Sequence, residues 1–167
     1  AIYLNSEQGK GSNFYFMVTL PRYNRQDSEK GEKKIISMDS LKNIRVLIAE
    51  DNPVNMVIAK RILQKWGVKV DEAVNGKLAL EMAEKGNYDL ILVDLEMPEM
   101  DGKTAVRKIN LLKKDIPSLA FTASVYENMK QDLLQTGFTD YILKPFKPEE
   151  LYRKIVGALQ RKHDPVS

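Results

Sequence analysis

Short apolar runs alternate with longer segments of helical periodicity through most of this 167-residue chain. The runs have at most about five residues, many of them β-branched, as expected for parallel strands with both faces buried. They predict strands at 45–49, 69–73, 90–94, 118–122 and 140–143. The intervening segments predict helices at about 53–66, 77–85, 103–114, 126–136 and 148–162. Five such units predict an α/β fold with a doubly wound, five-stranded parallel sheet and right-handed crossovers.

The expected helices carry apolar side chains three or four residues apart, the spacing that places them on one face. In the first helix, a spacing of four selects Val54, Ile58, Ile62 and Trp66. Gly137 is the expected C-terminal cap of the fourth helix, and Pro148 occupies the first turn of the fifth.

The first 42 residues follow a different pattern. Ile2 and Leu4 alternate with Tyr3, and apolar and other side chains alternate again from Phe14 to Leu20. This alternation predicts a β-hairpin over residues 1–21 that ends at Pro21. Residues 22–42 are polar and mixed in charge, so they predict a solvated linker before a domain at 43–163. Because the chain starts without Met and inside an expected strand, we expect it to be a piece of a longer protein.

Composition excludes several classes of protein. The chain has no cysteine, so disulfides, thiolate metal sites and cysteine nucleophiles are impossible. A formal charge of +3 is too small to indicate nucleic-acid binding by itself. Its apolar runs are far shorter than the roughly 20 residues that cross a bilayer as a helix.

Carboxylates follow two of the expected strands. Glu50 and Asp51 come directly after the first strand, and Asp94 ends the third. With a strand order of 2-1-3-4-5, these strands are neighbours where the order reverses, and ligands of open α/β sheets bind at that point. Three carboxylates so close together repel one another unless a cation lies among them, and Mg²⁺ prefers oxygen ligands. Taken singly, each acid has an ordinary alternative as a helix cap or a turn residue.

Three further polar residues stand at the ends of later strands. Thr122 ends the fourth strand and could donate a hydrogen bond to a phosphoryl oxygen, although a strand-end threonine is also common. Lys144 follows the fifth strand and could reach an anionic group at the sheet edge, although alone it reads as a surface lysine. Tyr141 lies on the strand face opposite Ile142, where simple packing is the usual role of an aromatic ring.

Taken together, these motifs resemble the receiver domain of two-component response regulators. They are Glu-Asp-Asn at 50–52, Asp-Leu-Glu-Met-Pro-Glu-Met-Asp-Gly at 94–102, Thr-Ala at 122–123 and Lys-Pro-Phe at 144–146. The resemblance implies the flavodoxin-like receiver fold, with a cis peptide bond before Pro145.

The resemblance also implies a role for each site residue. Asp94 would be the phosphorylated residue. Glu50, Asp51, Asp94 and the main-chain carbonyl of Glu96 would hold Mg²⁺. Lys144 would pair with the phosphoryl group, while Thr122 and Tyr141 would form the switch that responds to it.

The hairpin resembles the last hairpin of a histidine kinase ATP-binding domain, through Gly-Lys-Gly-Ser-Asn-Phe-Tyr-Phe at 9–16 and Leu-Pro at 20–21. A kinase remnant, a linker and a receiver follow one another in hybrid sensor histidine kinases. The ATP-binding motifs of that family and its phosphorylated histidine are absent here, and the single histidine, His163, is interpreted as a solvated tail residue. Whether to call the chain an enzyme therefore stays open, because it would catalyse only its own aspartyl phosphorylation.

We therefore expect a phospho-accepting domain of two-component or phosphorelay signalling. Its donor would be the phosphohistidine of a kinase dimerisation domain or of a histidine phosphotransfer protein. We expect a cytoplasmic location without nucleic-acid or membrane contacts, with membrane anchoring of the parent protein left open. A homodimer would use the hairpin or the face formed by the fourth helix, fifth strand and fifth helix.

Two other functions stay open at this point. The domain could be a phosphorylation-independent docking module with a vestigial acidic site. It could also be a phosphate-ester hydrolase with Asp94 as nucleophile and Glu96 as general acid, although no segment that would cover a substrate is evident in the sequence.

Overall fold

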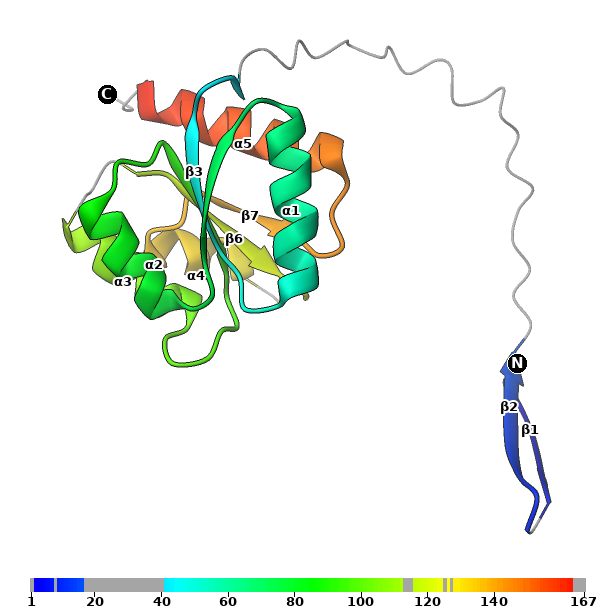
Figure 1. The fold of residues 1–167 in the computed structure, drawn as a ribbon. Coiled ribbons are helices and arrows are strands. Elements are labelled where there is room, and N and C mark those ends of the chain that lie inside the picture. The colour runs from blue at the N-terminus through cyan, green and yellow to red at the C-terminus, as the bar shows by residue number, and fades with distance from the viewer. Residues whose placement is uncertain are drawn as a thin grey trace. The chain divides into compact units, whose positions relative to one another are not determined.

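The structure is a computed structural model that describes residues 2–7, 9–16, 41–112, 116–124, 126 and 128–163. The chain divides into two compact units, residues 1–36 and 37–167, and each is described by itself. Figure 1 shows the elements of both.

The first unit contains an antiparallel hairpin of β1 (Ile2–Glu7) and β2 (Gly11–Phe16). Ile2 lies opposite Phe16, and Glu7 lies opposite Gly11. The turn between them includes Gly9 with a φ of +83°, a backbone conformation that favours glycine. The predicted hairpin is thus present. Residues 17–21 of its expected extent and residues 22–40 of the expected linker lie outside the described residues.

The second unit is built on a parallel sheet. Its strands are β3 (Arg45–Ala49), β4 (Lys69–Ala73), β5 (Leu90–Asp94), β6 (Ser118–Thr122) and β7 (Asp140–Leu143). They lie in the order β4-β3-β5-β6-β7, and every neighbouring pair is parallel. This is the predicted order 2-1-3-4-5, and all five strands have the predicted bounds.

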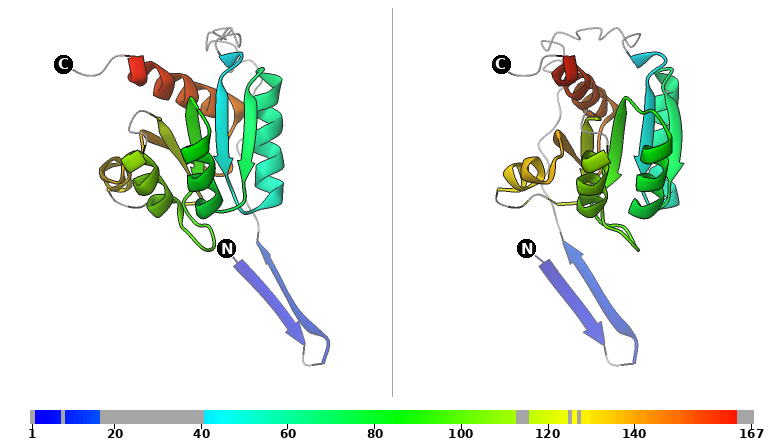
Figure 2. Two further views of the ribbon diagram at one scale, coloured as in Figure 1. Left: turned by 60° about the vertical axis from the view of Figure 1, so that its left-hand side comes forward. Right: turned by 90° about the vertical axis from the view of Figure 1, so that its left-hand side faces the viewer.

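Helices cover both faces of this sheet, as Figures 1 and 2 show. They are α1 (Pro53–Lys65), α2 (Gly76–Lys85), α3 (Gly102–Leu112), α4 (Met129–Thr136) and α5 (Pro148–His163). One core lies under α1 and α5 and includes Ile48 and Leu92, and the other lies under α2, α3 and α4 and includes Leu47 and Val93. Successive strand residues therefore enter opposite cores, which explains why the central strands β3, β5 and β6 are apolar on both faces.

The buried face of α1 agrees only in part with the predicted one, because Trp66 is buried and Ile62 packs against the core, whereas the two earlier positions are exposed. Val54 and Ile58 are 65% and 47% exposed, whereas Met56, Ala59 and Leu63 are buried. Positions that are four residues apart rotate progressively around a helix of 3.6 residues per turn, so a repeat of four cannot stay on the core side. The observed spacing of three and then four residues does stay there.

The start of α4 also differs from expectation. Asn128 has a φ of +62°, which is incompatible with helix, and α4 begins one residue later rather than at 126. Leu41, which we assigned to the linker, is fully buried in the core shared by α1 and α5. Gly137 caps α4 in a left-handed conformation, as predicted. Within the described residues, no helix is long and apolar enough to cross a membrane. The side chain of His163 lies outside the described part.

Candidate functional site

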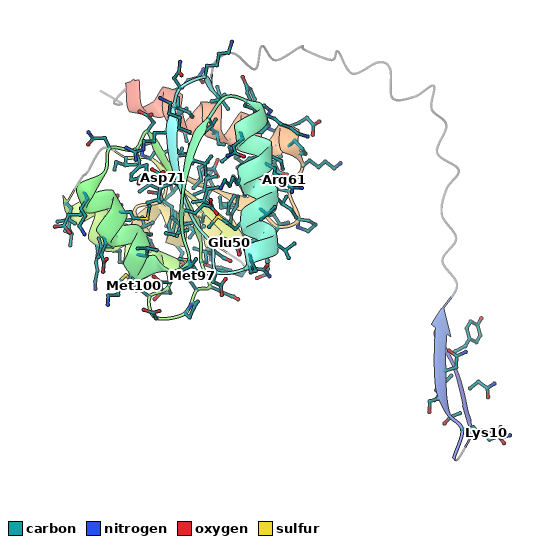
Figure 3. All side chains as sticks on the ribbon, viewed as in Figure 1. Lys10, Glu50, Arg61, Asp71, Met97 and Met100 are labelled. Carbon is teal, nitrogen blue, oxygen red and sulfur yellow. The ribbon has the colours of Figure 1, made fainter. Side chains whose placement is uncertain are left out.

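Glu50 and Asp51 leave β3 at the carboxyl edge of the sheet. The backbone amide of Glu50 still donates to the carbonyl of Ala73 at 3.0 Å, which holds the residue beside β4. Its side chain is only 2% exposed and accepts a hydrogen bond from Asn55 in α1, whereas Asp51 is exposed. Figure 3 labels Glu50 among the side chains of the second unit. Asn52 then caps α1, because its side chain accepts from the amide of Val54 at 2.9 Å. The three residues Glu50, Asp51 and Asn52 therefore form the whole connection from β3 to α1.

Asp94 is the last residue of β5 and is 7% exposed. Its Oδ1 atom accepts a hydrogen bond from the backbone amide of Glu96 at 3.3 Å. The loop after it returns tightly: the amide of Gly102 donates to the carbonyl of Leu95 at 3.1 Å. A Cβ atom on Gly102 would lie 2.2 Å from the carbonyl oxygen of Asp94, so only glycine permits this approach.

Lys144 joins the two buried carboxylates. Its Nζ atom lies 2.8 Å from Oε2 of Glu50 and 2.5 Å from Oδ2 of Asp94. The side chain enters the site from the end of β7, and the Lys144–Pro145 peptide bond is cis, as the resemblance implied. The lysine is thus an internal ion-pair partner, and its interpretation as a surface lysine is wrong.

Burial and pairing act in opposite directions on these groups. Burial raises the pKa of the Glu50 carboxyl, and the hydrogen bonds from Lys144 and Asn55 only partly oppose it, so the pKa remains above its ordinary value. Burial lowers the pKa of Lys144, but hydrogen bonds to Asp94 and Glu50 outweigh burial and raise it overall. The ammonium group therefore stays charged at neutral pH between the two carboxylates.

Thr122 and Tyr141 occupy different surroundings. Thr122 is buried at the end of β6, and its hydroxyl donates to the carbonyl of Ser124 at 2.9 Å. Tyr141 packs in the core under α2, α3 and α4, with the ammonium of Lys154 5.1 Å from its ring centre. Thr122 is therefore part of the site. Tyr141 lies outside the site, on the neighbouring strand β7.

The site residues form the wall of one cleft of about 220 Å³. Its lining consists of Glu50, Asp51, Asn52, Asn55, Asp94, Leu95, Glu96, Thr122, Ala123 and Lys144. Glu50, Asp51 and Asp94 each offer an oxygen atom within 4.8 Å of the others, and they are the only such acidic cluster in the described part of the chain. An all-oxygen donor set of this charge fits a hard divalent cation such as Mg²⁺.

The sequence analysis missed Asn55 as a member of this cleft. Its side-chain amide donates to Oε1 of Glu50 at 3.1 Å from the first turn of α1. The available signal was an asparagine, a poor helix former, in the first turn of a helix and five residues after an expected metal ligand.

This fold and cleft are those of a known class of protein. The family model of the response regulator receiver domain matches residues 46–156, so the chain belongs to that family. Over 147 residues it is 36% identical to the aerobic respiration control sensor protein ArcB of Escherichia coli K12, covering 86% of this chain. Over 156 residues it is 33% identical to the autoinducer 2 sensor kinase/phosphatase LuxQ of Vibrio vulnificus, covering 93% of this chain. The chain spans 18% of the length of each of these two relatives.

Solved structures show the same fold. The receiver domain of a sensor histidine kinase from Pseudomonas aeruginosa, with magnesium coordinated in its active-site cleft, is 34% identical with a TM-score of 0.66. The match covers 71% of this chain and 98% of that domain. The receiver domain of Ssk1 from Saccharomyces cerevisiae, solved with the histidine phosphotransfer protein Ypd1, is 28% identical with a TM-score of 0.68; 75% of this chain and 94% of that one are covered.

The particular kind of receiver follows from these relatives. The chain carries a receiver domain of the type found in hybrid sensor histidine kinases, which act in phosphorelay signalling. No finding favours the phosphorylation-independent docking module over this function.

Proposed function

We propose that Asp94 accepts a phosphoryl group from a phosphohistidine. One oxygen of its carboxylate attacks the phosphorus in line, the phosphorus–nitrogen bond to the histidine breaks, and the imidazole nitrogen leaves with the electron pair. The product is an aspartyl phosphate on this domain. The observation that carries the proposal is the position of Asp94, a buried carboxylate in an open cleft with an ammonium 2.5 Å from Oδ2.

Lys144 supplies positive charge where the transferred group arrives. In the unphosphorylated domain its ammonium is shared between Asp94 and Glu50. As charge develops on the equatorial phosphoryl oxygens, the same ammonium can follow them with little movement. Catalysis then depends mainly on positioning and electrostatic stabilisation, as expected for phosphoryl transfer.

Mg²⁺ would be held by the carboxylates of Glu50, Asp51 and Asp94, together with the main-chain carbonyl of Glu96. When bound, it would neutralise negative charge shared between these carboxylates and the phosphoryl oxygens. The mutual proximity of the three acids and their all-oxygen chemistry support this assignment.

Thr122 and Tyr141 would convert phosphorylation into a conformational change. The Thr122 hydroxyl must release the carbonyl of Ser124 before it can donate to a phosphoryl oxygen. Once free, Thr122 and the loop after β6 would shift toward the phosphoryl group. That shift would change the packing space beside Tyr141, which lies next to Ala120 on the adjacent strand. The surface formed by α4, β7 and α5 would carry the signal outward.

We further propose that the parent protein is a hybrid histidine kinase whose receiver works on the cytoplasmic side, where ATP-derived phosphohistidine is available. The donor would be a kinase dimerisation domain or a histidine phosphotransfer protein. We also propose that the chain forms a homodimer, through the hairpin or through the face formed by α4, β7 and α5. The exposed Leu134 and Leu143, on α4 and β7, support the second of these faces. Sedimentation of the chain before and after phosphorylation measures its oligomeric state.

Labelling of Asp94 tests the central proposal. The chain is incubated with acetyl phosphate and Mg²⁺, and the added phosphoryl mass is measured on the intact protein. Asp94→Asn should abolish the added mass, because the amide is not a comparable nucleophile. Asp101→Asn, in the same loop but exposed, is the matched control and should keep it. Undiminished labelling of the Asp94→Asn variant would refute the assignment.

A further inference from the structure

We propose that Asn55 is a positioning residue that holds Glu50 in the orientation needed for Mg²⁺ binding. This inference rests on the proposed function, because it concerns the same cation site. It assigns to α1 a direct role in the site, through a side chain that does not itself belong to the acidic cluster.

The two oxygens of Glu50 have separate partners. Oε2 accepts from the ammonium of Lys144 at 2.8 Å. Oε1 accepts from the side-chain amide of Asn55 at 3.1 Å and from the backbone amide of Asn52 at 3.3 Å. The carboxylate is therefore held from two sides, by β7 through the lysine and by the first turn of α1 through the asparagine.

The length of Glu50 explains why such a partner is needed. Glutamate has one more methylene group and one more rotatable bond than aspartate, so its carboxylate must be restrained at a greater distance from the backbone. Without the Asn55 side chain, Oε1 would keep only the longer bond from Asn52. The carboxylate plane could then turn about its terminal torsion, away from Asp51 and Asp94.

An amide suits this position because it donates without adding charge. Three carboxylates and one ammonium give the cluster a net charge of −2, which complements a divalent cation. A second lysine in place of Asn55 would reduce that charge, and an aspartate would repel Glu50. The neutral Asn55 donor orients the carboxylate and leaves the attraction for the cation intact.

Mg²⁺ affinity of the 167-residue chain, measured by isothermal titration calorimetry, tests the proposal. Asn55→Ala should weaken binding by about 10-fold, the low end for loss of an outer-shell partner. Asn110→Ala is the matched control. This helical asparagine also donates a 3.1 Å hydrogen bond from its side-chain amide, to the carbonyl of Gly137. It lies near the C-terminal end of α3, away from the acidic cluster. This variant should change the affinity less than about 2-fold, and urea unfolding checks that both variants are folded.

A second background separates orientation from a general loss of structure. Glu50→Asp shortens the side chain and withdraws its carboxylate from Asn55. In that background, Asn55→Ala should cost less than about 2-fold, whereas it costs about 10-fold in the native one. An equal loss in both backgrounds would overturn the positioning role, as would unchanged affinity of the single Asn55→Ala variant.

The rate of labelling by acetyl phosphate gives an independent readout. The Mg²⁺ concentration for half-maximal rate should rise about 10-fold in Asn55→Ala, while the rate at saturating Mg²⁺ stays within about 2-fold. A fall in the saturating rate without a shift in half-saturation would contradict the inference. If the native chain binds Mg²⁺ but Asn55→Ala binds it equally well, only this inference fails; if the native chain binds none, the proposed function fails with it.

Discussion

Replacing Lys144 by methionine removes one ammonium group from between two buried carboxylates. Methionine keeps an apolar stem of similar length, so the change isolates the charge. The lysine side chain is 16% exposed, and its partners Glu50 and Asp94 are 2% and 11% exposed at the side chain. In metal-free protein, Lys144→Met would leave both carboxylates without their shared counter-ion.

The expected loss of unfolding free energy is about 3 kcal/mol at neutral pH. Breaking a buried ion pair typically costs about 3–5 kcal/mol, because the remaining charge stays desolvated and unpaired. We expect the lower end, because burial already raises the pKa of Glu50 and a proton can neutralise part of the excess charge. In excess Mg²⁺ the loss should be smaller, since the proposed cation site places positive charge among the same carboxylates.

Urea denaturation in EDTA and in excess Mg²⁺, followed by circular dichroism, measures both quantities. Lys154→Met is the matched control: its ammonium lies 2.8 Å from a single carboxylate, that of Asp140, and it is 25% exposed. That variant should lose about 1 kcal/mol or less, equally in both buffers. A loss below about 1 kcal/mol for Lys144→Met in EDTA, with an unchanged m value, would refute the electrostatic reasoning.

Three further predictions concern core packing, the charge of Asp101 and the backbone at Gly102. Leu41→Ala should lower the unfolding free energy by about 3 kcal/mol, because it empties a fully buried position; an unchanged urea midpoint would show that the domain does not need this residue. A hydrogen bond from the Thr104 backbone holds the pKa of Asp101 below its ordinary 3.8, so its stabilising contribution is present above that value and is lost as pH falls through the lowered pKa. The stability advantage over Asp101→Asn, about 0.5 kcal/mol near pH 7, should therefore vanish in acid, and an advantage independent of pH would contradict this. Gly102→Ala places a Cβ 2.2 Å from the Asp94 carbonyl, so it should cost about 1–3 kcal/mol and slow acetyl phosphate labelling; native-like values of both would disprove the steric argument.

The sheet and the main members of the site could be predicted from the sequence because both depend on local patterns. Short apolar runs mark four of the five strands, and the polar residue that follows each of these runs must lie at the carboxyl edge of a parallel sheet. The edge strand β4 is mixed, with Val70 and Ala73 as its apolar residues. Glu50, Asp51, Asp94, Thr122 and Lys144 accordingly line one cleft. These residues are far apart in the chain, and they meet because each lies at the carboxyl end of a strand in the same parallel sheet.

Tertiary structure decided what local pattern left ambiguous. The first helix has apolar residues on more than one side, so only packing against β3 and its neighbours selects Met56 and Leu63 over Val54 and Ile58. The same packing sets the rotation of α1 about its axis. That rotation brings the Asn55 side chain to Glu50, a contact that no spacing in the sequence specifies because it depends on how a helix and a strand end meet in space.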